Sequence, residues 1–294
     1  MKEVYHLRLR NRLVKDILPI GFGKILGDNE FAIRVVEITR SDPYFELLQK
    51  RYRNGEEFIL TSWSVKRNYT KQEIGAARLF RVRLGTPFEP CGEDCGTEYE
   101  EATGCRVCGA GAEHRGPLYL RESNLPRTDI GHSIADEIVV RRGFAECFWR
   151  YNLTGPTFNP IYQKSNKAII EGWFEVADLP RLANIVEPTN VFNNPLMTLP
   201  DMGQICPVGD TIGLNLVSEV YVDVDLEQAP SFFATKQFTG VRRGMLRETP
   251  VYLAKPDFFD FVKKEDIRGL SFEIAHLRPG SNFSMQVVGE YRGG

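Results

Sequence analysis

Four cysteines within eighteen residues constrain the fold of this chain more than any other feature. They form two close pairs, Cys91 with Cys95 and Cys105 with Cys108. Tetrahedral zinc takes four thiolates, and each short pair lets two sulfurs reach one ion from a tight turn. Because four thiolates would close the coordination shell, we interpret the predicted site as a structural zinc site. A redox dithiol and unligated surface cysteines are the alternatives.

The composition predicts a globular protein without a large charge bias. Of the 294 residues, 42% are hydrophobic and 26% are charged, as in ordinary soluble domains. The formal charge of -2 makes nucleic acid an unlikely partner, since such binding usually requires a basic excess. No apolar run is long enough for a membrane span, and no leading apolar stretch resembles a signal peptide. With two further cysteines, Cys147 and Cys206, the chain is predicted to be cytoplasmic.

Strand and helix signals alternate along the first ninety residues. Residues 31–38 and 80–84 are rich in β-branched and aromatic side chains, as strands are. Ser41-Asp42-Pro43 supplies a helix start, and Thr70 with Glu73 forms a second one, a capping box. These patterns predict an α+β fold with mixed or antiparallel sheets and short helices. The cysteines would form a zinc ribbon inserted at residues 88–118.

An internal repeat is the second informative feature. Residues 138–161 align without a gap on residues 252–275, so that Phe144 meets Phe258 and Gly155 meets Gly269. Each copy is predicted to form a strand, an amphipathic helix, a glycine turn and a second strand. Two matching units of this size favour a duplicated element, and chance similarity of two amphipathic helices is the alternative.

The repeat also suggests how the chain is divided. Residues 187–210 are rich in Pro, Asn and Gly and show little periodicity, so we interpret them as a linker-like connection. An N-terminal α+β domain, 1–186, would then contain the ribbon and the first repeat. A C-terminal α+β unit, 211–294, would contain the second repeat.

Several motifs around the cysteines resemble a known family. These are the second pair with its glycine, Cys105-x2-Cys108-Gly109, the segment of Leu125, Pro126 and Asp129, and the sequences TKQEIGAARLF and NLTGPTFNPI. Together they resemble the double-CxxCG motif proteins of myxobacteria and related immunity proteins of bacterial polymorphic toxin systems. The similarity covers residues 69–161. It implies a cytoplasmic protein that neutralises a cognate toxin by binding it.

The predicted function is therefore that of a zinc-stapled binding protein with a protein partner, a toxin. Five acidic residues of the ribbon loop are the candidate partner-binding face, because a charged surface can match a basic partner: Glu93, Asp94, Glu98, Glu100 and Glu101. No catalytic constellation is visible in the sequence, so no enzyme activity is expected. An enzyme with a scattered site and a nucleic-acid-binding ribbon protein are the alternatives.

Overall fold

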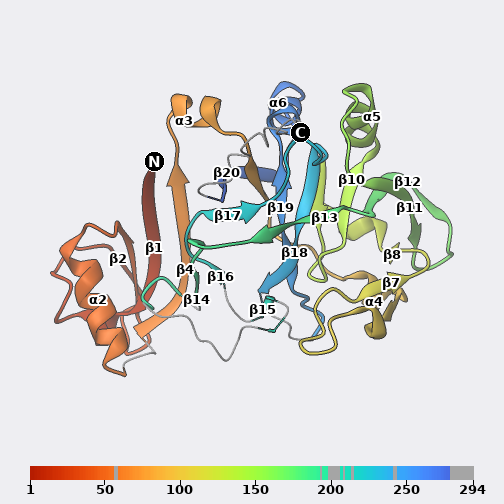
Figure 1. Cartoon of the computed structure of the whole chain (residues 1–294). Helices are drawn as coiled ribbons and strands as arrows, with labels where there is room; N and C mark the ends of the chain where they lie inside the picture. Colours follow the sequence, from red (N-terminus) through yellow and green to blue (C-terminus); the bar gives the residue numbers. More distant parts are fainter. Residues whose placement is uncertain are drawn as a thin grey trace, which may run out of the picture.

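The predicted α+β class, with short helices and several sheets, is confirmed in a computed structural model. The structure describes residues 1–55, 59–192, 194–197, 206–207, 209–212, 215–240 and 244–278. This part of the chain is a strand-rich α+β protein with short helices and several sheets (Figure 1). Within it, no helix combines the length and the apolar character that crossing a membrane requires. The end of the predicted C-terminal unit, beyond residue 278, lies outside the described residues.

The N-terminal sheet has one covered face. Its four antiparallel strands lie in the order β2-β3-β1-β4: β2 Lys24–Leu26, β3 Ile33–Ile38, β1 Lys2–Arg10 and β4 Leu60–Asn68. The short helix α1, Asn11–Val14, follows β1, and α2, Pro43–Arg53, lies against the sheet. Every second residue of β1 from Tyr5 to Leu9 is buried, together with Phe45 of α2. This alternation is expected of a strand with one face in a core.

Both predicted helix starts are confirmed. The Asp42 side chain accepts a hydrogen bond from the Tyr44 N–H at 2.9 Å, which caps α2. Thr70 and Glu73 form the capping box of α3, Lys71–Ala76. In both cases the polar side chain satisfies an N–H group that the first helical turn leaves without a partner.

Both copies of the predicted strand–helix–strand element are present. The first comprises β10 Ile138–Arg141, α5 Arg142–Arg150 and β11 Thr157–Gln163, and the second comprises β19 Thr249–Ala254, α6 Pro256–Lys264 and β20 Leu270–Leu277. The two helices share one aromatic core. The Phe144 ring lies 5.5 Å from that of Phe261, and the Phe148 ring lies 6.3 Å from that of Phe258. All four side chains are buried.

The two copies exchange a strand, so each completes the sheet of the other. Each copy is preceded by a hairpin partner, β9 Ile130–His132 for β10 and β18 Phe232–Gly240 for β19. Between β10 and β11 lies β12, Ile169–Ala177, which follows the first copy in the chain. Between β19 and β20 lies β5, Phe80–Leu84, which precedes the first copy. The predicted connection at 187–210 therefore does not separate two independent sheets.

The glycine turn of each copy contacts the backbone of the hairpin partner of the other copy. Gly155 has φ 143° and Gly269 has φ 112°, a region that favours glycine. A Cβ atom on Gly155 would overlap the carbonyl oxygen of Phe232, at the start of β18. A Cβ atom on Gly269 would overlap the carbonyl oxygen of Ile130, at the start of β9. The structural equivalence of the two copies thus extends from the helices to the turns.

Six strands around the second copy form a closed ring. Two further strands take part, β13 Arg181–Ile185 and β17 Val220–Asp223. The ring order is β13-β17-β20-β5-β19-β18, because β13 pairs with both β17 and β18. Apolar side chains from five of these strands form one buried cluster: Ala183, Val220, Val222, Phe233, Val251, Leu253 and Ala275. The opposite face of β18 and β19 packs on α6 through the aromatic core.

Short strands complete the described structure. Strand β8, Tyr119–Leu120, is parallel to β11, and β15, Thr211–Ile212, is parallel to β18. Two small antiparallel pairs stand apart from the main sheets: β6 Glu98–Glu100 with β7 Glu113–Arg115, and β14 Val191–Phe192 with β16 Asn215–Leu216. The first pair forms the stem of the loop that carries the second cysteine pair.

Candidate metal centre

The duplicated fold has two halves, which run from β5 to β11 and from β12 to β20 in the chain. Each half carries a long insertion between its first strand and its hairpin. In the first half the insertion lies between β5 and β9 and contains the four clustered cysteines, the short helix α4, Gly92–Cys95, and two 3-10 turns, Glu101–Thr103 and Glu122–Asn124. In the second half it lies between β12 and β18, and it contains Cys206. The two insertions meet at the tips of their loops, as the following contacts show.

The tip of the first insertion is a tight knuckle at Cys105. The Gly109 N–H donates to the Cys105 carbonyl at 2.7 Å, and the Cys105 N–H donates to the Ala110 carbonyl at 2.8 Å. Gly109 has φ 77°, and a Cβ on Gly104 would lie 2.8 Å from the Gly109 carbonyl oxygen. The glycines on either side of the pair are therefore required by the turn.

A similar knuckle is present in the second insertion, at Cys206. The Gly209 N–H donates to the Cys206 carbonyl at 2.8 Å, and the Cys206 N–H donates to the Asp210 carbonyl at 2.8 Å. The Asp210 carboxylate is held by β18, because its Oδ1 accepts a hydrogen bond from the Phe238 N–H at 2.9 Å. Its other oxygen is left to face the first insertion. An aspartate thus stands near the position where a second cysteine of a knuckle would lie.

Four potential metal ligands come together where the knuckles meet. The sulfurs of Cys105, Cys108 and Cys206 and a carboxylate oxygen of Asp210 all lie within 4.8 Å of one another. The Cys105 and Cys206 sulfurs are 3.7 Å apart, and Cys108 Sγ is 3.1 Å from Asp210 Oδ2. Zinc–sulfur bonds of about 2.3 Å in a tetrahedron place two sulfurs about 3.8 Å apart. The group is therefore close enough to bind a metal ion, and its dimensions fit a tetrahedral one.

The pKa shifts of the Cys105 and Cys108 thiols are consistent with a cation-binding site. Backbone N–H groups of Cys108 and Val107 lower the pKa of the Cys105 thiol. Burial raises the pKa of Cys108, and its hydrogen bond to the Asp210 carboxylate acts in the same direction. Without a cation, the Asp210 carboxylate therefore opposes a second thiolate beside it. A metal ion removes this conflict, because it binds the deprotonated forms of both side chains.

The other predicted pair, Cys91 and Cys95, is not part of this group. Cys91, which directly precedes α4, and Cys95, at its end, are buried, with exposed fractions of 0% and 1%. The start of α4 is held by Glu137, whose Oε1 accepts a hydrogen bond from the Gly92 N–H at 2.8 Å. Burial raises the pKa of Cys91 to about 11, which disfavours the thiolate that a metal needs. The structure thus groups the second predicted pair with Cys206 and Asp210, not with the first pair.

The acidic residues of the predicted partner face are largely engaged within the chain. The Arg247 guanidinium donates to Glu93 and Glu101 at 3.2 and 3.0 Å. Arg115 pairs with Glu100, and Asp94 accepts a hydrogen bond from Cys91 Sγ at 3.4 Å. Glu98 is exposed at the start of β6. Partner binding by this face stays a prediction, and its available negative charge is smaller than the sequence suggests.

A pocket of about 440 Å³ lies between the halves, beside the β6–β7 hairpin. Such a volume is within the range of small-ligand sites. His114 and Glu175 line the pocket, and the His114 ring contacts Glu175 through Nε2. The other ring nitrogen lies 3.0 Å from the Gly116 carbonyl oxygen, which can only accept a hydrogen bond. Both nitrogens face acceptors, and the hydrogen bond to Glu175 raises the pKa of His114, which favours the imidazolium. It therefore has no free nitrogen for general base catalysis.

The sequence matches no protein-family model and no curated protein. The resemblance to the double-CxxCG motif proteins therefore stays a prediction that rests on the quoted motifs.

Proposed function

We propose that this chain is a zinc-stapled binding protein, and that it neutralises a protein toxin by stoichiometric binding. The observation that carries the proposal is the donor set of three cysteines and one aspartate. Four protein ligands leave no open position for water or substrate, which is typical of structural zinc sites. Zinc is favoured over magnesium or calcium because three of the four donors are thiolates, whereas those ions prefer oxygen ligands.

The role of the metal would be to join the two halves of the fold. Cys105 and Cys108 come from the first insertion, and Cys206 and Asp210 come from the second. An ion bound by all four would connect segments about one hundred residues apart in the chain. Such a cross-link stabilises a fold by restricting the unfolded chain. The toxin as partner comes from the family resemblance alone.

The test combines metal analysis with capture of a partner from the native host. We expect about one zinc per chain by mass spectrometry of the purified protein, and one toxin-like protein captured at near-equal stoichiometry. Loss of that capture after chelation would link the two properties. A protein that purifies without zinc from zinc-containing medium contradicts the staple, and a toxin assay unaffected by excess protein contradicts the immunity role.

A second candidate function is an enzyme that uses the 440 Å³ pocket. Tyr99, Asp136 and Tyr252 line it in addition to the His114–Glu175 pair, so several polar groups converge there. Burial raises the pKa of Asp136 and of Tyr252, and perturbed ionisation of this kind is common in active sites. However, Tyr252 donates to Asp136, and His114 has both nitrogens engaged. Since the groups bond to one another, we place this candidate second.

A further inference from the structure

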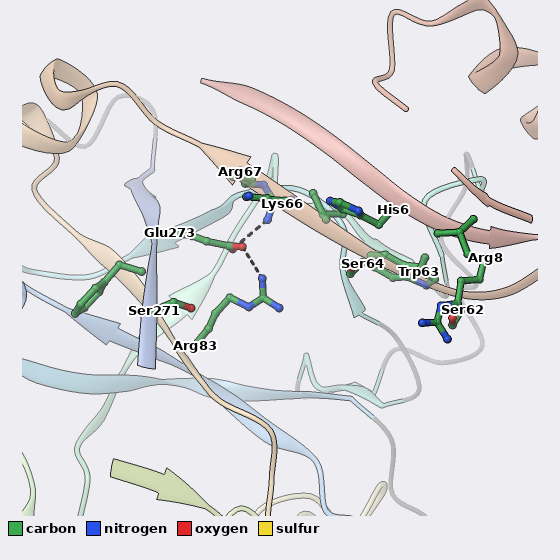
Figure 2. A pocket seen from close by; sticks show the side chains of 13 residues that line it. His6, Arg8, Ser62, Trp63, Ser64, Lys66, Arg67, Arg83, Ser271 and Glu273 are labelled. Atoms are coloured by element: carbon green, nitrogen blue, oxygen red, sulfur yellow. Dashed lines mark hydrogen bonds and ion pairs between the residues drawn. The ribbon is translucent and has the colours of Figure 1, made fainter. Parts of the chain in front are cut away.

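A positively charged groove lies between the N-terminal sheet and the ring of strands. It has a volume of about 610 Å³, and Figure 2 shows its two walls. One wall is residues 62–67 of β4 with His6 and Arg8 of β1, and the other is Arg83 of β5 with Ser271 and Glu273 of β20. The groove shares no lining residue with the 440 Å³ pocket. It also shares none with the four potential metal ligands, which we call the metal group: Cys105, Cys108, Cys206 and Asp210.

The charge of the groove is opposite to that of the whole chain. Four cationic side chains line it, Arg8, Lys66, Arg67 and Arg83, and its single lining carboxylate is that of Glu273. The Arg67 side chain is buried and pairs with Glu3 as well as with Glu273, so the surplus comes from the other three. The chain as a whole has a formal charge of -2. A local surplus of the opposite sign attracts anionic partners and orients them on approach.

Glu273 does not neutralise the exposed cations of the groove. Its carboxylate is already shared by three guanidinium groups, those of Arg67, Arg81 and Arg83, at 3.0, 3.1 and 2.9 Å. Arg8 and Lys66 are exposed, and neither forms an ion pair with any residue that the structure describes. These two side chains are therefore available to an external anion.

The same wall is the free edge of a sheet. Strand β4 pairs with β1 on one side, and no described strand pairs with it on the other. Ser62, Ser64 and Lys66 share one face of β4, and Arg8 lies opposite Ser62 on β1. The two serines are small, which leaves room between Arg8 and Lys66 for the side chains of an added strand. Exposed strand edges accept extended peptides through main-chain hydrogen bonds.

We propose that the groove binds an extended acidic segment of a protein partner, which adds as a strand to the edge of β4. Side chains on one face of a strand recur every second residue, about 6.6 Å apart. Arg8 lies beside Ser62, and Lys66 lies four residues further along β4, about 13 Å away. Carboxylates at every second position of the segment would therefore include one near Arg8 and another, four residues on, near Lys66, with Arg83 on the opposite wall. The inference rests on the proposed function, because it names the partner-binding site of the binding protein.

A nucleic acid fits the groove less well than an acidic peptide. Single strands bind to proteins largely by stacking bases on exposed aromatic rings. The aromatic side chains of the groove, Trp63 and Phe272, are partly buried, and Phe272 packs against Phe80 with ring centroids 5.8 Å apart. The free strand edge, in contrast, offers both N–H donors and C=O acceptors, which an extended peptide backbone matches, whereas the phosphates of a nucleic acid only accept hydrogen bonds.

The experiment measures binding of a labelled peptide of Thr-Glu repeats by fluorescence anisotropy. We expect the double substitution Arg8→Glu and Lys66→Glu to weaken binding roughly tenfold or more, since two attractive contacts become repulsive. Both positions are exposed, so the fold should tolerate the change. The matched control is Lys15→Glu with Lys71→Glu, two exposed lysines outside the groove, which should leave affinity within about twofold.

A second pair of peptides separates strand addition from simple charge attraction. N-methylation of the peptide on one edge should abolish binding, and methylation on the other edge should preserve it, because only one edge would pair with β4. Equal effects of both methylated peptides overturn strand addition. Tighter binding of an oligothymidylate than of the peptide, or equal loss in the control variant, overturns the acidic-segment proposal.

The outcome also separates this inference from the proposed function. A toxin whose capture is unchanged by Arg8→Glu with Lys66→Glu would leave the binding function intact and reject this groove as its site. Peptide binding that depends on Arg8 and Lys66, in a protein that neutralises no toxin, would support the groove and reject the immunity role.

Discussion

The two halves of the duplicated fold share a core but differ in their insertions. Phe144 and Phe258 occupy equivalent core positions with exposed fractions of 2% and 0%, and Gly155 and Gly269 form equivalent turns. The first insertion carries four cysteines, whereas the second contributes one cysteine and an aspartate to the metal group. Neither half contains the whole group. The comparison teaches that the core repeats within each half, while the candidate metal centre exists only between them.

Removing the metal should have the largest effect on stability. If zinc is bound at about a thousand times its Kd, chelation should lower the free energy of unfolding by about 4 kcal/mol. The measurement is urea unfolding with and without a chelator. The Cys206→Ser variant should be destabilised and should no longer respond to the chelator. Cys147→Ser is the control, since Cys147 lies on α5 outside the metal group. A wild-type protein insensitive to chelation would contradict a metal link between the halves.

Substitution of the glycine in either turn should lower the free energy of unfolding nearly as much as loss of the metal. Gly269→Ala and Gly155→Ala would each force a Cβ onto a carbonyl oxygen of the other half, at a positive φ. We expect a loss of about 3 kcal/mol for each, measured by thermal or urea unfolding. Gly143→Ala on α5 is the control, because no atom lies within 4 Å of its added Cβ. It should be neutral or stabilising by up to about 1 kcal/mol. A large loss of stability in only one of the two variants would contradict the structural equivalence of the halves.

The two cysteine pairs of the first insertion should respond differently to substitution. Cys91→Ala removes a buried thiol, so we expect a loss of about 1–2 kcal/mol in stability with the zinc content unchanged. Cys105→Ala should abolish zinc binding. Zinc measurement on both purified variants decides between the two ligand sets. Loss of zinc in Cys91→Ala would favour the four-cysteine ribbon predicted from the sequence.

Several elements of this fold could be predicted because their signals are local. Thr70 and Glu73 of the capping box are three residues apart, and Phe144 and Phe148 on α5 are four residues apart. The strand exchange between halves could not be inferred, because β5 and β12 have no feature that identifies their partners. Local patterns specify elements, whereas pairing between distant strands depends on the whole fold.

The candidate site was predicted in part for the same reason. Cys105 and Cys108 form a recognisable knuckle, but Cys206 lies 101 residues from Cys105 and follows a different spacing. Its signal is the turn Cys206-Pro-x-Gly209-Asp210, in which a carboxylate lies near the position of a second thiolate. Cys91 and Cys95 satisfied the expected spacing, yet their four-residue separation matches one turn of α4. Spacing alone cannot distinguish a ligand pair from two buried side chains of a helix.

The smallest predicted effect is a pH dependence of stability, which arises from a contact between the two halves. His114 lies on β7 of the first insertion, and its partner Glu175 lies on the exchanged strand β12. The Glu175 contact raises the pKa of His114, so the folded protein holds this proton more tightly than the unfolded chain. The resulting stabilisation is complete below the unfolded pKa of about 6.5 and is lost as the pH rises through the higher folded value. His114→Gln should remove this component, so the difference in unfolding free energy between wild type and variant should shrink as the pH rises from 6 to 9. Comparing the two proteins at each pH cancels the pH dependence of metal binding. A difference that grows with pH would mean that His114 is neutral in the folded state and that Glu175 does not hold the two halves through its charge.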